Sequence, residues 1–213
     1  MSSTKKHAKS LSDAKAAKPS KRLKQALNTA PTQKLDIYVF GSGDNGELGL
    51  GHETRNGKKP TKVKRPRLND LLDANTVGVV QVAVGGMHCV ALTRDNKIVT
   101  WGVNDNGALG RDTKWEAPTR DIDADSDSED DDDSGLNPKE SRPMAIDGGL
   151  FPKDVVFVQV EANDSTSFVL TDDGFVYGWG TFSVSLNITY LIHWLTFEGK
   201  RWCHRLFKGG SSE

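Results

Sequence analysis

IYVFGSGDNGELGLG at Ile37–Gly51 and IVTWGVNDNGALGRD at Ile98–Asp112 are two copies of one motif, and they align without a gap. A second motif also recurs: VAVGGMHCVALTRDNKIVTWG at Val82–Gly102 aligns without a gap with VEANDSTSFVLTDDGFVYGWG at Val160–Gly180. Repeats with a period of several tens of residues are typical of solenoids and propellers, in which each unit buries its apolar surface only against its neighbours. The period therefore indicates a repeat architecture.

Each copy predicts a set of short strands separated by turns. The expected strands are Val79–Val84, Cys89–Thr93, Lys97–Trp101, Val155–Val160, Phe168–Thr171 and Phe175–Trp179. Between them lie Gly85-Gly86, Asp95-Asn96, Asn163-Asp164 and Asp173-Gly174, residue types that adopt left-handed turns at low cost. No convincing amphipathic helix interrupts the strands, so the pattern predicts an all-β fold built from four-stranded propeller blades.

The repeated positions are expected to be structural. They are Gly41, Gly46, Gly49, His88, Trp101, Gly102, Gly107, Gly110, Trp179 and Gly180, and Asp105 recurs with them. At Gly41, Gly102 and Gly180 we expect the backbone to pass too close to a neighbouring blade for a Cβ. We expect His88 to lock its own turn through backbone hydrogen bonds, because no companion ligands stand at metal-binding spacing.

Three strings, FGSGDNGELGLG, VAVGGMHCVALT and GVNDNGALGRDT, together resemble the regulator-of-chromosome-condensation repeat, whose propeller normally closes with seven blades. The resemblance covers Leu35–Phe182. Judged by the length of one copy, it implies an incomplete propeller of about two to two and a half blades. The predicted divisions are a disordered basic arm at 1–34, the partial propeller at 35–182 with an acidic disordered loop at 116–142, and a non-family tail at 183–213.

The tail begins at Ser183, where the family pattern stops. Relatives continue with an arginine, a polar turn and a Gly-Leu-Gly element. The tail is interpreted as a retained intron, a frameshift or a premature gene-model end, with an isoform-specific exon as the alternative. Its apolar part, Leu186–Phe197, is shorter than the roughly 20 residues that span a bilayer, which favours a strand over a membrane anchor.

Charge is segregated although the formal net charge is only −1. Met1–Lys34 carries eight lysines and Arg22 against Asp13 alone, and Asp121–Asp133 holds nine acidic residues. Blocks of like charge repel themselves and do not fold. The arm has three open interpretations: a solvated tail, a nuclear-import signal, and a contact with chromatin phosphates. Its candidate residues are Lys5, Lys6, Lys9, Lys18, Lys21, Arg22 and Lys24.

The acidic run lies between blades in the repeat alignment and is interpreted as an inserted loop. One interpretation is that the run serves solubility and charge balance. The alternative is that it is phosphorylated at Ser126 or Ser128, each of which has an acidic residue three positions on. Binding of the basic arm or of histone-like partners is a further alternative.

No constellation for covalent chemistry, cofactor binding or metal ligation is present in the sequence. The Gly-rich segments lack the Lys-Ser ending of a phosphate loop. Cys89 lies in an apolar strand as a buried thiol, and with Cys203 in the tail it makes no disulfide framework. The sequence therefore predicts a protein that is not an enzyme, with no cofactor.

The resemblance implies a nuclear, chromatin-associated guanine-nucleotide exchange factor for a Ran-like small GTPase, with an import receptor as a further partner and no membrane. By resemblance, Asp44 and Asp164 lie on the GTPase-binding face, although either could be an ordinary turn aspartate. The family's nucleotide-displacing wedge would follow Gly180-Thr181-Phe182, where the foreign sequence begins. We therefore expect weak or no exchange activity. A scaffold module without exchange activity and a non-functional fragment are the alternatives, and the basic arm that leads directly into the first blade favours the exchange factor.

Overall fold

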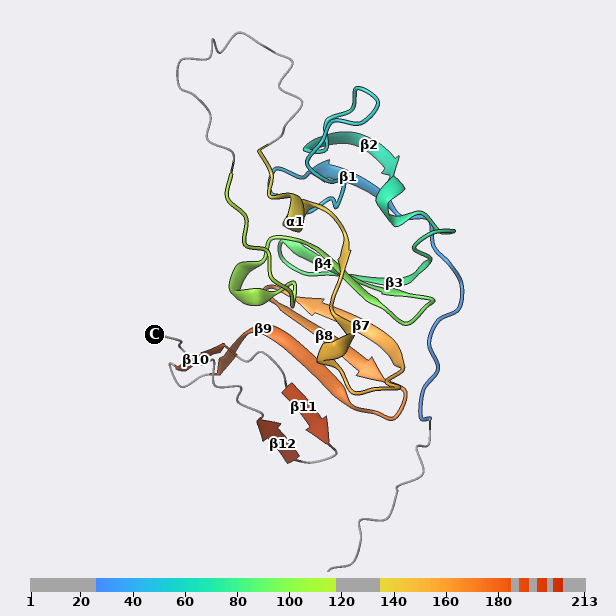
Figure 1. The fold of residues 1–213 in the computed structure, drawn as a ribbon, viewed down its shortest axis with the longest axis vertical. Coiled ribbons are helices and arrows are strands. Elements are labelled where there is room, and N and C mark those ends of the chain that lie inside the picture. The colour runs from blue at the N-terminus through green and yellow to red at the C-terminus, as the bar shows by residue number, and fades with distance from the viewer. Residues whose placement is uncertain (1–25, 118–134, 185–187, 192–194, 199–200, 205–213) are drawn as a thin grey trace, which may run out of the picture.

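The computed structural model describes residues 26–117, 135–184, 188–191, 195–198 and 201–204. Within these residues the regular secondary structure is almost entirely antiparallel β-sheet, and three sheets lie side by side as successive blades (Figure 1). The helical segments described are three single 3-10 turns and the four-residue helix α1 (Pro138–Ser141). None of the described helices is long and apolar enough to cross a membrane. The predicted all-β fold and incomplete propeller are confirmed.

The strands form one partial and two fuller blades. Blade 1 contains β1 (Tyr38–Ser42) and β2 (Lys62–Leu68). Blade 2 contains, in spatial order, β3 (Val79–Val84), β4 (His88–Thr93), β5 (Ile98–Gly102) and β6 (Met144–Ala145). Blade 3 contains β7 (Phe157–Asn163), β8 (Thr166–Thr171), β9 (Val176–Val184), β11 (Leu195–Glu198) and β12 (Arg201–His204), and β10 (Ile188–Leu191) pairs with the far end of β9.

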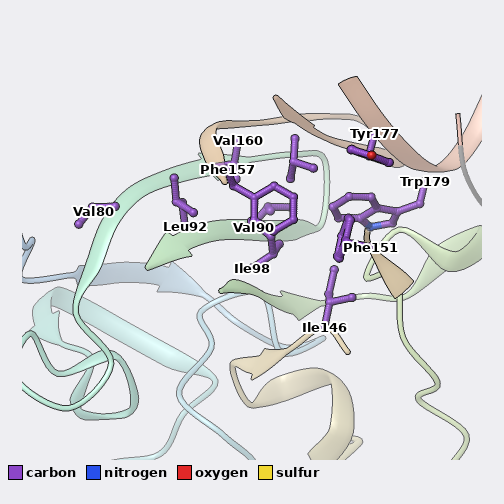
Figure 2. Packing of buried hydrophobic residues seen from close by; sticks show 11 residues of the cluster. Val80, Val90, Leu92, Ile98, Ile146, Phe151, Phe157, Val160, Tyr177 and Trp179 are labelled. Atoms are coloured by element: carbon purple, nitrogen blue, oxygen red, sulfur yellow. The ribbon is translucent and has the colours of Figure 1, made fainter. Parts of the chain in front are cut away.

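The apolar strand residues of blade 2 are buried on both faces because this blade packs between blades 1 and 3. On β4, Val90 and Leu92 belong to the cluster between blades 2 and 3, whereas Cys89 and Ala91 belong to the cluster facing blade 1. Side chains alternate along a strand, so an uninterrupted apolar run fills both interfaces. Figure 2 shows the larger cluster, in which Phe151 packs edge-on against Phe157 and Tyr177 with ring centroids 4.7 and 5.5 Å away.

Two tryptophans join consecutive blades in the same way. The indole Nε1 of Trp101 donates to the Glu47 carbonyl oxygen of blade 1 at 3.1 Å, and that of Trp179 donates to the Ala108 carbonyl oxygen of blade 2 at 2.8 Å. Both side chains are almost fully buried. The repeated aromatic therefore fixes each blade to the loop of the blade before it.

At Gly41, Gly102 and Gly180 the structure requires glycine for a different reason from the predicted close approach of a neighbouring blade. A Cβ on Gly102 would meet the Met87 carbonyl oxygen and one on Gly180 the Ser165 carbonyl oxygen, both within the same blade, and a Cβ on Gly41 would meet nothing within 4 Å. What these three share is a positive φ of 97–112°. The close approach of a neighbouring blade occurs instead at Gly49 and Gly110, where a Cβ would lie 2.6 and 2.8 Å from the indole rings of Trp101 and Trp179.

The Gly85-Gly86 turn also differs from the prediction, since neither glycine has a positive φ. A Cβ on Gly85 would collide with the Asn163 carbonyl oxygen and the His88 ring, and one on Gly86 with the Asp164 carboxylate. Glycine is required here by the adjacent turn of blade 3.

The acidic insertion lies within a blade, not between blades as the repeat alignment predicted. Its flanking strands, β5 and β6, pair with each other in blade 2. The acidic run itself, Ser126 and Ser128 included, falls in 118–134, outside the described residues. The predicted disordered segment 116–142 was also too long: α1 lies within it, and Asn137 Nδ2 donates to the Thr113 carbonyl oxygen at 2.9 Å, which closes the base of the insertion.

The described parts of the tail pair with blade 3. Strand β11 stands opposite β9 at Gly178 and Tyr177. In the repeat alignment these two residues correspond to Thr100 and Val99 of β5, which are the residues that stand opposite β6 in blade 2. Strand β11 therefore takes the place in blade 3 that β6 takes in blade 2. The break in the family sequence at Ser183 is not a break in the sheet.

Candidate functional site

One face of the blades carries the loops that follow β1, β3, β5 and β7. We call it the loop face and define it by Gly43–Gly49, Gly85–Met87, Asn104–Gly110 and Asp164-Ser165. These segments meet at one end because alternate connections of antiparallel strands lie at the same end of a sheet. Contacts join them across the blades: Gly86 N donates to the Asp164 carbonyl oxygen at 3.1 Å, and the Glu47 carbonyl oxygen accepts from the Trp101 indole.

Asp44 is exposed at the tip of the first loop. Its carboxylate accepts a hydrogen bond from Ser42 Oγ at 2.7 Å. The loop below it is fixed by Gly43 N donating to the Thr61 carbonyl oxygen and by Asn45 bonding to the Glu47 carboxylate. The described hydrogen bonds of the Asp44 side chain do not cap its own backbone, so the carboxylate is held in an outward position by a neighbouring hydroxyl.

Asp164 is exposed in the β7–β8 turn of blade 3. The side chain that caps this turn is Asn163, whose Oδ1 accepts from Asp164 N at 2.9 Å. The Asp164 carboxylate lies against Gly86, at the place where a Cβ of residue 86 would stand. The structure thus brings Asp44 and Asp164 to one face, on the two blades that flank blade 2.

Exposed apolar side chains accompany these carboxylates on the loop face. Val84 and Met87 flank the Gly85-Gly86 turn and are 68% and 41% exposed. Asp105, predicted to be structural, accepts Ala108 N through its carbonyl oxygen and forms a 3-10 turn in the equivalent loop of blade 2. The face therefore combines acidic and apolar groups on turns that are fixed from below.

His88 lies beneath the loop face, and the side-chain hydrogen bonds described for it run to blade 3 and not to its own turn as predicted. Its Nε2 lies 2.9 Å from Ser167 Oγ in blade 3, and Ser167 Oγ donates to the Ala108 carbonyl oxygen at 2.8 Å. The ring joins two blades in addition to packing on its own turn. Burial lowers the pKa of His88 below its ordinary value, against smaller raising effects of the Thr166 backbone and Asp164.

Cys89, the residue after His88, is a free and buried cysteine, as predicted. Burial, with a smaller effect of the Glu47 carboxylate, raises the pKa of the thiol to about 12. It is therefore a neutral packing residue. Among the described residues no group of three or more His, Cys, Asp and Glu side chains could hold a metal ion.

The described end of the basic arm runs along the face opposite the loop face. Leu27 N and Asn28 N donate to the Asp172 carbonyl oxygen at the β8–β9 turn, and Leu35 N donates to the Val79 carbonyl oxygen at 2.8 Å. The predicted disordered arm was therefore too long by residues 26–34. Its candidate residues, Lys5, Lys6, Lys9, Lys18, Lys21, Arg22 and Lys24, lie outside the described residues.

A cluster of cations that the repeat pattern does not predict lies on the outer edge of blade 1. It lines a groove of about 630 Å³ with Arg55, Lys58, Lys59, Lys62, Lys64, Arg65 and Arg67. The sequence signal was the absence of any acidic residue from Thr54 to Asn69. The net charge of the whole chain, −1, gives no sign of this basic cluster.

Models of the regulator of chromosome condensation (RCC1) repeat match residues 36–92 and 79–108. The chain is 45% identical over 160 residues to the guanine nucleotide exchange factor SRM1 of Saccharomyces cerevisiae, covering 73% of this chain and 32% of that protein. It is 41% identical over 155 residues to the protein pim1 of Schizosaccharomyces pombe, covering 73% of this chain and 26% of pim1. The chain thus spans between about a quarter and a third of the length of these curated relatives.

Two solved structures are similar. The crystal structure of Prp20p from Saccharomyces cerevisiae, described with its binding properties to Gsp1p and histones, matches with a TM-score of 0.57 at 37% identity, over 75% of this chain and 31% of that one. The structure of Kap60 bound to yeast RCC1 (Prp20) matches with a TM-score of 0.59 at 33% identity, over 84% of this chain and 37% of that one.

Proposed function

Because the chain belongs to the regulator of chromosome condensation (RCC1) repeat family, we propose that its loop face docks a Ran-like small GTPase as part of a nuclear guanine-nucleotide exchange factor. The observation that carries the proposal is the presence of Asp44 and Asp164 on one face, each exposed on a turn that other residues hold in place. A relative named as an exchange factor and a neighbour described as binding Gsp1p support the class of partner.

The loop face suits a protein partner in its chemistry. Two carboxylates can accept charge-assisted hydrogen bonds from a basic surface, and such bonds contribute about 1.5–3 kcal/mol each. Val84 and Met87 supply apolar area between them. The blade-to-blade hydrogen bonds below keep the face rigid, so little conformational entropy is lost on docking.

Exchange by such a face requires binding energy and no covalent chemistry. A factor that binds the nucleotide-free GTPase more tightly than the loaded form lowers nucleotide affinity by the same coupling free energy, since linkage is reciprocal. Rigid docking residues and an element that presses on the nucleotide site are sufficient for this.

The pressing element is where this chain differs from the family pattern. From Thr181 onward the end of β9, Thr181–Val184, pairs antiparallel with β10, Ile188–Leu191. This stretch of sequence lacks the arginine, polar turn and Gly-Leu-Gly element that the resemblance leads us to expect. We therefore propose that docking is retained while nucleotide release is slow.

The test measures docking and exchange separately. Binding of the full chain to immobilised, nucleotide-free Ran-like GTPase is followed by interferometry, and release of a fluorescent GDP analogue is followed in solution. We expect Asp44→Ala and Asp164→Ala each to weaken docking by about 10- to 100-fold, the equivalent of one charged hydrogen bond.

Asp36→Ala is the matched control, because Asp36 is also exposed and precedes β1 at the end opposite the loop face. It should leave docking unchanged. Absence of docking, or an equal loss with Asp36→Ala, contradicts the proposal. Docking that depends on both aspartates without any release of GDP supports the docking face and assigns the chain to an interaction module.

The basic arm is proposed to act independently of the docking face, as a contact with chromatin and an import receptor. Its described end lies at the Asp172 turn, on the opposite side of the blades, so both surfaces can be occupied together. Removing residues 1–25 should reduce nuclear accumulation of a fluorescent fusion while docking to the GTPase persists. Unchanged accumulation contradicts this part of the proposal.

A further inference from the structure

The basic groove on blade 1 is built by a hairpin folded beside a strand. Arg55 and Lys58 exchange backbone hydrogen bonds of 3.2 and 3.0 Å, and Asn56 and Gly57 between them both have positive φ. This is the conformation of a tight two-residue hairpin. Arg67 Nη1 of β2 donates to the Lys59 carbonyl oxygen at 3.3 Å, which fixes the hairpin beside the strand. The cations therefore stand on two backbone segments tied to each other.

A bulge increases the number of cations that face solvent. Between the pairs Val39–Arg67 and Gly41–Val63, three residues of β2 stand opposite Phe40 alone. A bulged strand changes the direction of its side chains, and here Lys64, Arg65 and Pro66 are all exposed in succession. Strict alternation would have turned one of them inward.

The groove is unbalanced in charge. Its lining contains seven Lys and Arg side chains and one acidic residue, Asp70. The ion pairs found within the described part of the chain are His52–Glu53 and Lys97–Asp95, and neither contains a cation of the groove. Protection of an edge strand accounts for one or two lysines and a proline. It does not account for a concave cluster that also draws Arg55, Lys58 and Lys59 from outside the strand.

We propose that this basic groove binds the phosphate backbone of double-stranded nucleic acid, without sequence readout. Charge complementarity with a polyanion is the reason, because each phosphate neutralised by Lys or Arg releases a counterion. The described lining has no aromatic side chain on which unpaired bases could stack, which favours a duplex over a single strand. The groove borders the loop face, since Lys62 pairs with Ser42, but its cations are distinct from Asp44 and Asp164, so the proposal does not depend on GTPase docking.

The experiment compares two triple variants of the full chain, each of which loses three positive charges. The groove variant is Lys62→Gln, Lys64→Gln and Arg65→Gln. The matched control is Arg94→Gln, Lys97→Gln and Lys153→Gln, three exposed cations outside the groove. The arm is identical in all proteins, so its own contribution cancels. Fluorescence anisotropy with a labelled 30-base-pair duplex is measured from 50 to 300 mM salt.

The slope of log K against log salt is the deciding quantity. Three lost phosphate contacts should reduce its magnitude by about 2 to 3 in the groove variant, with an affinity loss of tenfold or more, and the control should shift it by less than about 0.5. All substituted residues are exposed, and equal thermal midpoints verify folding. Equal slopes in the two variants overturn the proposal.

A footprint distinguishes duplex from acidic protein. Lysines are acetylated with a water-soluble ester in the presence of the duplex or of a synthetic peptide of residues 121–133, and the sites are read by mass spectrometry. Protection of Lys62 and Lys64 by the duplex supports the proposal. Protection by the acidic peptide alone means that the groove binds an acidic segment, and the proposal fails.

Discussion

Replacing Gly110 by Ala tests whether the tryptophan contact between blades requires glycine beneath it. Gly110 has φ +65°, and a Cβ there would lie 2.8 Å from Trp179 Nε1, the atom that donates to the Ala108 carbonyl oxygen. Alanine must therefore adopt a left-handed conformation and also displace the indole. The matched control is Gly107→Ala, since Gly107 has φ +80° in the same loop and a Cβ there would meet nothing within 4 Å.

The two substitutions separate backbone strain from interblade contact. The left-handed conformation costs about 1–2 kcal/mol in either variant. Gly110→Ala adds overpacking of about 1–3 kcal/mol and loss of one hydrogen bond of about 0.5–1.5 kcal/mol. The free energy of unfolding should thus fall by about 1–2 kcal/mol for Gly107→Ala and by about 2.5–6.5 kcal/mol for Gly110→Ala.

Urea unfolding at 25 °C followed by circular dichroism measures both values, and tryptophan fluorescence reports the displaced indole. A difference between the variants below about 0.5 kcal/mol, the size of an ordinary surface-substitution effect, would refute the reasoning. Conformation alone would then explain the glycine. A similar fluorescence spectrum in both variants would lead to the same conclusion.

Three further expectations concern two buried polar groups and one half-buried one. The pKa of His88 in the folded chain lies below its ordinary value, so the unfolded chain takes up a proton first as pH falls. The contribution of His88 to the free energy of unfolding is therefore fully present above pH 6.5 and is lost as pH drops through that value, by at most about 1.4 kcal/mol per pH unit. Urea titrations at several pH values should show that this slope disappears in His88→Gln. In a Cys203→Ser background, the buried Cys89 thiol of the folded chain should react with Ellman's reagent at pH 8 at least about a hundredfold more slowly than the same thiol in 8 M urea. The reason is that burial raises its pKa to about 12. Equal rates in the two conditions would exclude burial of the thiol. Arg111 donates through Nε to Thr100 Oγ1 at 3.0 Å and through Nη2 to the Thr100 carbonyl oxygen at 2.9 Å. Arg111→Met should therefore lower the thermal midpoint, because the free energy of unfolding falls by about 2–4 kcal/mol. Arg111→Lys should recover only part of that lost stability.

The repeats predicted the blades well because one strong pattern occurs twice without a gap. β3 spans Val79–Val84 as expected, and β4 begins one residue earlier, at His88. β7 was predicted at Val155–Val160 and is found at Phe157–Asn163. Asn96, in the turn of the neighbouring blade, accepts Phe157 N and donates to the Val155 carbonyl oxygen. A bond between blades therefore fixes where that strand starts, and local pattern does not contain it.

The contacts of the candidate site were less predictable for the same reason. Local pattern identifies Asp44 and Asp164 only as turn residues, and their assignment to one face came from the family resemblance alone; in the structure that common face follows from how three sheets stack. The glycines were recognised as repeated, whereas at Gly49 and Gly110 the atoms that exclude a Cβ belong to tryptophans tens of positions away. The basic groove escaped prediction because a two-residue hairpin folds Arg55 and Lys58 beside β2, and averaging charge over the whole chain hides such a cluster.

The way the two tryptophans bind has a consequence for how such a ring of blades can evolve. Trp101 and Trp179 each recognise a main-chain carbonyl, and the residues that provide it, Glu47 and Ala108, differ in size and charge. The hydrogen bond that joins the blades thus does not use the side chain at that position. Ala108 is only 1% exposed whereas Glu47 is half-buried, so at the Glu47 position a substitution can change what the rim recognises while the main-chain joint that assembles the ring is inherited unchanged.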